Sequence, residues 1–168
     1  MPLSMYQASA PCFVRMLKNL SVILDKAEAH ADAKKIEHTV LTGDRLFPDM
    51  FALARQVQIA TDSAKGAMAR LAGAEIPKFE DTEQTFGDLK TRIAKTIAYV
   101  ETFKPAQIDG TEDKDIVIKA GGKEMKFKGT DFLLGFAYPN FYFHITTTYN
   151  LLRHRGVEIG KWDFLGKA

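Results

Sequence analysis

The side chains best placed for chemistry lie in the last long apolar segment of the chain. His144 stands in the middle of a predicted helix, with Asn140 one turn before it and Thr148 one turn after it. Side chains at this spacing share one helix face, and polar groups on a buried face need hydrogen-bond partners. His144 could therefore be a satisfied core residue, a ligand contact or a general base, since an unperturbed imidazole titrates near neutral pH.

The other chemically capable residues give weaker signals. His30 and His154 lie near predicted helix ends, where an imidazolium interacts favourably with the helix dipole. Cys12 is the only cysteine, so the chain cannot form an internal disulfide, and we expect the reducing cytoplasm as its compartment. The sequence has no Gly-rich phosphate-binding pattern, no nucleophile elbow and no paired-cysteine metal motif.

The composition indicates one globular domain over residues 1–168. Hydrophobic residues make up 46% and charged residues 26%, a balance that argues against disorder. The 23 basic and 21 acidic residues are mixed along the chain, so we expect no nucleic-acid partner. The most apolar stretch, residues 132–145, is shorter than the roughly 20 residues that cross a bilayer, so we expect no membrane association.

Four segments carry apolar residues at steps of three and four, the spacing of an amphipathic helix. They cover residues 3–30, 47–72, 82–103 and 131–155. Between the third and fourth segments the period changes, and Gly121-Gly122 permits the positive φ angles of a tight turn. The sequence therefore predicts an all-α four-helix bundle with a short β-hairpin over residues 115–129, which must pack on the bundle or on a partner.

Several residues predict where the helices begin, end or bend. Pro48 suits the first turn of the second helix, and Gly73 suits its C-terminal cap. Asp81 with Gln84 resembles a capping box for the third helix. Thr130 is a predicted N-cap for the fourth helix, and Pro139 should kink that helix. We expect the tail after residue 156 to fold back over the end of the bundle.

Two parts of the chain carry a family resemblance. Phe141-Tyr142-Phe143-His144 followed by Leu151-Leu152-Arg153-His154-Arg155-Gly156 resembles the last helix of the DinB/YfiT-like helical-bundle superfamily. The segment Phe47-Pro48-Asp49-Met50 and the closing Gly160-Lys161-Trp162-Asp163-Phe164-Leu165-Gly166 resemble a branch known only as a domain of unknown function. The resemblance implies a bundle of up-down-down-up order that is often dimeric. In many members three histidines, one from the second helix and two from the fourth, hold a divalent metal.

The chain departs from that histidine pattern at two of its three positions. His144 matches the second histidine of the last helix, but Asn140 stands where the first would be. The second helix has no histidine, and Gln56 is its nearest polar candidate, with Asp49 and Asp62 as further choices. Amide oxygens are weak ligands for zinc or nickel. We therefore expect no metal or other cofactor, or at most a weakly bound divalent metal on His144 with Gln56 and Asn140.

Three functions remain open from the sequence. The first is a bundle that has lost the three-histidine site and keeps a pocket for a small ligand, lined by Gln56, Asn140, His144 and Tyr149. The second is a metal-dependent transferase or hydrolase of the DinB type that uses His144 with a degenerate ligand set. The third is a structural homodimer whose bundle faces and hairpin form the interface. Fold alone does not choose among them.

Overall fold

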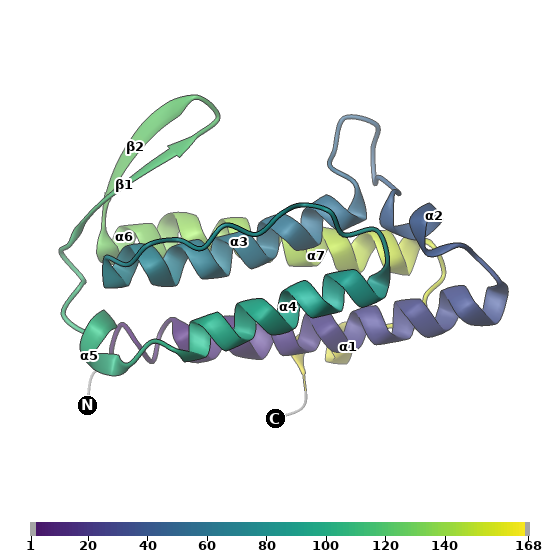
Figure 1. Ribbon diagram of the computed structural model, residues 1–168, viewed down its shortest axis with the longest axis horizontal. Coiled ribbons are helices and arrows are strands. Elements are labelled where there is room, and N and C mark those ends of the chain that lie inside the picture. Colours follow the sequence, from purple (N-terminus) through teal and green to yellow (C-terminus); the bar gives the residue numbers. More distant parts are fainter. Residues whose placement is uncertain (1–2, 167–168) are drawn as a thin grey trace.

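Four long helices form the body of the molecule. In the computed structural model, which describes residues 3–166, they are α1 (Ala10–Lys34), α3 (Leu53–Ala72), α4 (Phe86–Glu101) and α7 (Tyr138–His154). They lie in two layers, α1 with α4 and α3 with α7 (Figure 1). The predicted four-helix bundle is therefore confirmed. Within residues 3–166, no helix has both the length and the apolar character needed to cross a membrane.

The order of the helices follows from one long connection. Residues 73–85 leave the end of α3 and run back along that helix before α4 begins (Figure 1). As a result α3 and α4 run in the same direction, while α1 and α7 run in the opposite one. This is the up-down-down-up order that the sequence resemblance implies.

Aromatic and aliphatic side chains fill the space between the two layers. Phe13, Phe86, Phe132 and Phe141 are among the largest fully buried side chains, and they come from both layers. The rings of Phe13 and Phe141 meet edge to face with their centroids 4.9 Å apart, an arrangement that favours the π-quadrupoles of both rings. Phenylalanine therefore ties the two layers together near the start of α1.

The predicted hairpin is present and packs on the bundle. Strands β1 (Asp115–Ala120) and β2 (Lys123–Lys128) pair antiparallel. Gly121 and Gly122 both have positive φ, 57° and 76°, which an L side chain rarely adopts and glycine adopts readily. One face of the hairpin is apolar, and Phe127 places its ring against Phe132, with centroids 6.1 Å apart. The bundle thus supplies the support that two strands alone lack.

Two helices begin later than the sequence predicts. The second long helix begins at Leu53, so Pro48 lies in the preceding loop, residues 43–52, and not in a first helical turn. The third begins at Phe86, because the capping box is formed by Thr85 and Asp88, not by Asp81 and Gln84. The Thr85 hydroxyl oxygen accepts a hydrogen bond from the backbone N–H of Asp88, and the Asp88 carboxylate accepts one from the backbone N–H of Thr85. Gly73 does cap α3, with φ of 70°.

The start of the last helix also differs from the prediction. The helix begins with α6 (Gly129–Phe132), which places Thr130 inside it and not at its N-cap. A π-helical segment, η1 (Leu133–Ala137), then leads into α7. The N–H of Tyr138 bonds the carbonyl of Leu133, five residues back. Pro139 has no backbone N–H to donate to the preceding turn. The wider π-helical turn just before it therefore takes the place of the kink that the sequence predicted.

Three further short helices complete the chain. They are α2 (His38–Thr42), α5 (Pro105–Ile108) and α8 (Lys161–Leu165). The tail does fold back, but α8 packs along α1, not over the bundle end. Lys26 Nζ lies 2.7 Å from Asp163 Oδ1, and Asn19 Nδ2 donates to the carbonyl of Phe164 at 2.9 Å.

Candidate functional site

Five polar residues line the contact between α3 and α7, of which Gln56 and His144 are buried and the other three are half-buried. On α3 these are Gln56, Ser63 and Arg70, seven residues and about two turns apart, so they share one face. On α7 they are Asn140 and His144, one turn apart. We call these five residues the α3–α7 seam. The helices are antiparallel, so His144 meets Gln56 at one end and Asn140 meets Ser63 further along.

His144 and Gln56 form the first polar pair of the seam. His144 Nδ1 lies 2.6 Å from Gln56 Oε1, and the side chains are buried, with exposed fractions of 7% and 1%. Gln56 Nε2 donates to the carbonyl of Phe51 at 3.0 Å, which fixes the orientation of the amide. The amide oxygen therefore accepts from His144 Nδ1, so the proton sits on Nδ1 and the lone pair on Nε2.

His144 is neutral at physiological pH. Burial lowers the pKa of His144 to about 4, and the positive charge of Arg55 acts in the same direction. Within residues 3–166, Nε2 has no hydrogen-bond partner, and every fully buried side-chain nitrogen or oxygen there does have one. Nε2 is therefore a neutral acceptor that retains access to solvent.

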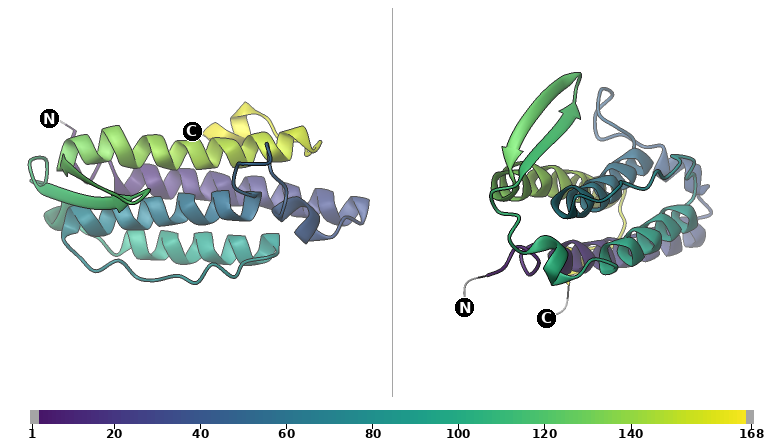
Figure 2. Two further views of the ribbon diagram at one scale, coloured as in Figure 1. Left: turned by 90° about the horizontal axis from the view of Figure 1, so that it is seen from above. Right: turned by 60° about the vertical axis from the view of Figure 1, so that its left-hand side comes forward.

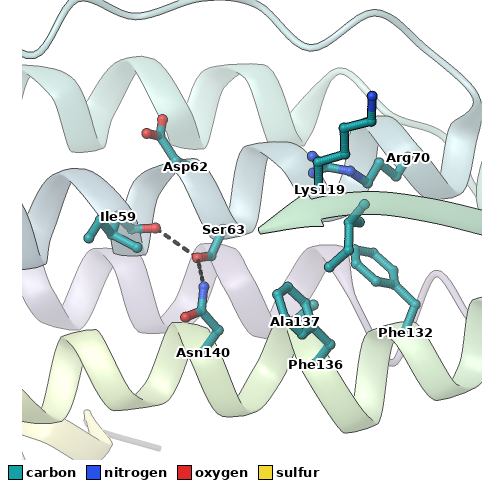
Figure 3. Close-up of a pocket in the computed structure, with 10 residues that line it drawn as sticks. Ile59, Asp62, Ser63, Arg70, Lys119, Phe132, Phe136, Ala137 and Asn140 are labelled. Atoms are coloured by element: carbon teal, nitrogen blue, oxygen red, sulfur yellow. Dashed lines mark hydrogen bonds between the residues drawn. The ribbon is translucent and has the colours of Figure 1, made fainter. Parts of the chain in front are cut away.

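Asn140 makes a second, separate pair. Its Nδ2 donates to Ser63 Oγ at 2.8 Å, and Ser63 Oγ donates in turn to the carbonyl of Ile59 at 2.7 Å (Figure 3). Asn140 is thus directed across to α3 and not along its own helix to His144. Ser63 did not stand out in the sequence, because serine is common on helix surfaces and its partner lies 77 residues away.

Tyr149 lies apart from the other predicted pocket residues. Its ring packs edge to face against Phe164 of α8, with centroids 6.2 Å apart. Five residues separate it from His144, which is about 140° around a helix, so it faces a different neighbour. The structure therefore brings Gln56 and His144 together, places Asn140 one turn along, and places Tyr149 against the tail.

A cavity of about 180 Å³ adjoins Asn140 on the outer side of the seam. Helix α3, strand β1 and the η1–α7 segment form its walls (Figure 3). The lining residues are Ile59, Asp62, Ser63, Arg70, Ile118, Lys119, Phe132, Phe136, Ala137 and Asn140. We call it the Arg70 cavity. Of the four predicted pocket residues only Asn140 lines it, together with Asp62, one of the further metal-ligand candidates.

The remaining histidines do not join the seam. His38 Nε2 lies 3.1 Å from Asp32 Oδ1 at the far end of α1. In the part of the chain that the structure describes, no three His, Cys, Asp or Glu side chains are grouped as metal ligands would be. The seam therefore offers one imidazole and two carboxamides, with a hydroxyl and a guanidinium beyond them.

Comparison with known proteins shows the family to which the chain belongs. Residues 5–165 match the family described as "Domain of unknown function (DUF1993)". The chain belongs to the DUF1993 family. A crystal structure of a DinB family member protein from Shewanella denitrificans superposes with a TM-score of 0.87 and 45% sequence identity, covering 97% of this chain and 92% of that one. This DUF1993 chain is therefore DinB-like in both sequence and fold. No curated protein matches it.

Proposed function

We propose that this DUF1993 protein is a DinB-like bundle without the three-histidine metal site that binds a small ligand at His144. The observation that supports the proposal most is the Gln56–His144 pair. Gln56 holds the imidazole in one tautomer and leaves the Nε2 lone pair unused by the described residues. A buried acceptor held in place and left open is what a ligand with a hydrogen-bond donor requires.

The donor set of the seam does not fit the metal centre that the DinB resemblance implies. Gln56 Oε1 is occupied by His144 Nδ1, and the Asn140 amide is directed to Ser63. The two carboxamides therefore do not converge with the imidazole on one point. Zinc and nickel favour imidazole and thiolate over amide oxygen, so this set favours a hydrogen-bonded ligand over a coordinated ion.

The surroundings of His144 indicate the character of the ligand. Phe51 and Phe143 are 53% and 55% exposed. The Phe51 carbonyl receives the Gln56 amide, and the Phe143 ring lies 5.2 Å from the imidazole, edge to face. The exposed Phe143 ring beside a neutral acceptor favours an uncharged ligand that has an apolar body and one hydrogen-bond donor.

Nitrogen-15 NMR of the imidazoles tests this proposal, with phenol as the probe. At neutral pH we expect His144 to carry its proton on Nδ1, and we expect millimolar phenol to shift its Nε2 resonance. Substitution His144→Gln should abolish phenol binding. Tyr149→Phe, on another helix face, should leave it unchanged. A His144 protonated on Nε2, or one that does not respond to phenol, contradicts the proposal.

A DinB-type metal-dependent transferase or hydrolase is the second candidate, and the same Nε2 lone pair favours it. Metal-bound histidines commonly donate their other ring N–H to a neighbouring acceptor, as His144 does to Gln56. Metal analysis after dialysis against zinc or nickel separates the two candidates. One equivalent of ion that is lost in His144→Gln supports this enzyme, whereas the ligand-binding proposal expects less than one equivalent in both proteins.

We further propose that the protein is a homodimer. Apolar side chains are exposed in the loop of residues 43–52, among them Leu46 and Phe47, the latter 63% exposed. This loop and the β-hairpin project from the same side of the bundle, above α3 and α7 (Figure 2). Sedimentation should give a dimer that Phe47→Asp converts to monomer. A monomer that persists at high concentration contradicts this proposal.

A further inference from the structure

The Arg70 cavity contains a cation without a counter-charge. Arg70 is half-buried in the last turn of α3, and no carboxylate among residues 3–166 forms an ion pair with its guanidinium. Burial lowers the pKa of Arg70, because water is removed from the cation. A guanidinium remains protonated at neutral pH even so. A half-buried charge without a partner is unfavourable, so an anion bound beside Arg70 would stabilise it.

The acidic residue of the cavity does not neutralise Arg70. Asp62 Oδ1 lies 3.0 Å from Lys65 Nζ and 2.9 Å from Arg92 Nη2, so two other cations already hold this carboxylate. Lys119 of β1 adds a second positive charge to the lining. In the view of Figure 3, Arg70 and Lys119 lie at the same end of the cavity. The cavity is therefore positive at that end.

A glycine lets the guanidinium lie where it does. Gly66 is one turn before Arg70 on α3, and a methyl group at position 66 would overlap Arg70 Nη1. Glycine in a helix interior costs about 1 kcal/mol relative to alanine. Glycine at position 66 therefore makes the helix locally less stable, but it leaves the space that the Arg70 guanidinium occupies.

Apart from its polar edge, the rest of the lining is apolar and suits a ring. The rings of Phe132 and Phe136 lie nearly parallel, with centroids 6.1 Å apart, and Ile118 of the hairpin lines the same cavity. A closed cavity of about 150 Å³ holds one benzene molecule. The 180 Å³ here therefore suits a single ring with one small polar group.

From these contacts we infer that the Arg70 cavity binds a small aromatic monocarboxylate. The carboxylate pairs with the fork of Arg70 nitrogens, with Lys119 as a second cation, and the ring lies against Phe132 and Phe136. The amide of Asn140 and the hydroxyl of Ser63 form the polar edge of the same space. This site goes beyond the proposed function, because it needs neither His144 nor Gln56.

Benzoate titration followed by NMR and calorimetry tests the inference. We expect benzoate to bind and to shift amide resonances of Arg70, Phe136 and Lys119. The neutral isostere benzamide should bind at least about tenfold more weakly, because it has no charge to pair with Arg70. Equal binding of benzoate and benzamide, or no binding of benzoate at millimolar concentration, overturns the inference.

Two variants locate the anion. Arg70→Gln should weaken benzoate binding by about tenfold or more. Gly66→Ala, which keeps every charge and favours the helix, should also weaken it, because it displaces the guanidinium. His144→Gln should leave benzoate binding unchanged, which separates this site from the proposed function. Unchanged affinity in both Arg70→Gln and Gly66→Ala overturns the inference, and melting curves of each variant verify the fold.

Discussion

The two sides of α3 hold their buried polar groups in different ways. Toward α4, the Arg92 side chain is 1% exposed, and its nitrogens bond Thr61, Asp62 and Glu83 at 2.8–3.0 Å. Toward α7, the Nε2 of His144 and the guanidinium of Arg70 have no such partners in residues 3–166. One side is saturated with hydrogen bonds and ion pairs, and the other retains unused capacity.

The saturated side fastens the connection between α3 and α4. Arg92 Nη1 donates to the carbonyl of Glu80, in the middle of residues 73–85. The ring centroid of Phe79, in the same connection, lies 4.0 Å from Lys65 Nζ and 4.1 Å from Lys95 Nζ, within the range of cation–π contact. A long loop without secondary structure is held in place in this way. The difference teaches that the buried charge of Arg92, which is fully paired, fastens the chain around α3, whereas the half-buried guanidinium of Arg70 has no ion-pair partner in residues 3–166.

The largest test of the comparison is Arg92→Met against Arg70→Met. Loss of Arg92 leaves buried acceptors unpaired, and we expect the free energy of unfolding to fall by about 3–5 kcal/mol. Loss of Arg70 removes no ion pair and should change it by less than about 1 kcal/mol. Urea denaturation measures both. Similar losses in the two variants would remove the distinction between the sides.

Acid should weaken the seam through His144. The pKa of His144 in the folded protein, about 4, lies below the ordinary histidine value of 6.5, so the unfolded chain binds more protons between those pH values. Stability contributed by neutral His144 is therefore complete above pH 6.5 and is lost as the pH falls to about 4, by up to about 3 kcal/mol. Denaturation of His144→Gln across this range should lack that loss, whereas His38→Gln should retain it.

The Asn140–Ser63 bond should make a moderate contribution. A double-mutant cycle with Asn140→Ala and Ser63→Ala should give a coupling energy of about 1 kcal/mol, the usual net value of a partly buried hydrogen bond. Coupling near zero would mean that both side chains find water instead.

The smallest expected effect is a gain. Gly66→Ala should raise the free energy of unfolding by about 0.5–1 kcal/mol, because alanine favours the helix and Arg70 can move its flexible end aside. Thermal unfolding measures it. A loss of stability would show that the position of Arg70 supports the fold, contrary to the comparison above.

Much of the fold follows from periodicity in the sequence. The apolar stripes of α1, α3, α4 and α7 are buried as predicted, because a helix can bury only one face at that spacing. Helix starts were less predictable. Pro48 and Thr130 have the right chemistry for their predicted positions, but the loop before Leu53 and the early start of α6 depend on tertiary packing.

Of the candidate site, only the pairing of Gln56 with His144 could be expected, because the family resemblance named Gln56 as the nearest polar candidate for a ligand beside His144. In the structure Gln56 Oε1 lies 2.6 Å from His144 Nδ1. Tyr149 could have been placed on another face by its five-residue spacing from His144. The Arg70 cavity was not predictable, because the wall containing Lys119 comes from the hairpin, and no local pattern says on which helix a hairpin rests.

The long connection between α3 and α4 also affects how the chain can assemble during synthesis. Because α3 and α4 run in parallel, neither layer of the bundle is a helical hairpin of consecutive long helices. Helix α1 must wait for α4 to find its partner, and α3 must wait for α7, the last long helix made. The layer of α1 and α4 can close once α4 has been made, whereas the layer of α3 and α7 stays open until the last long helix emerges from the ribosome.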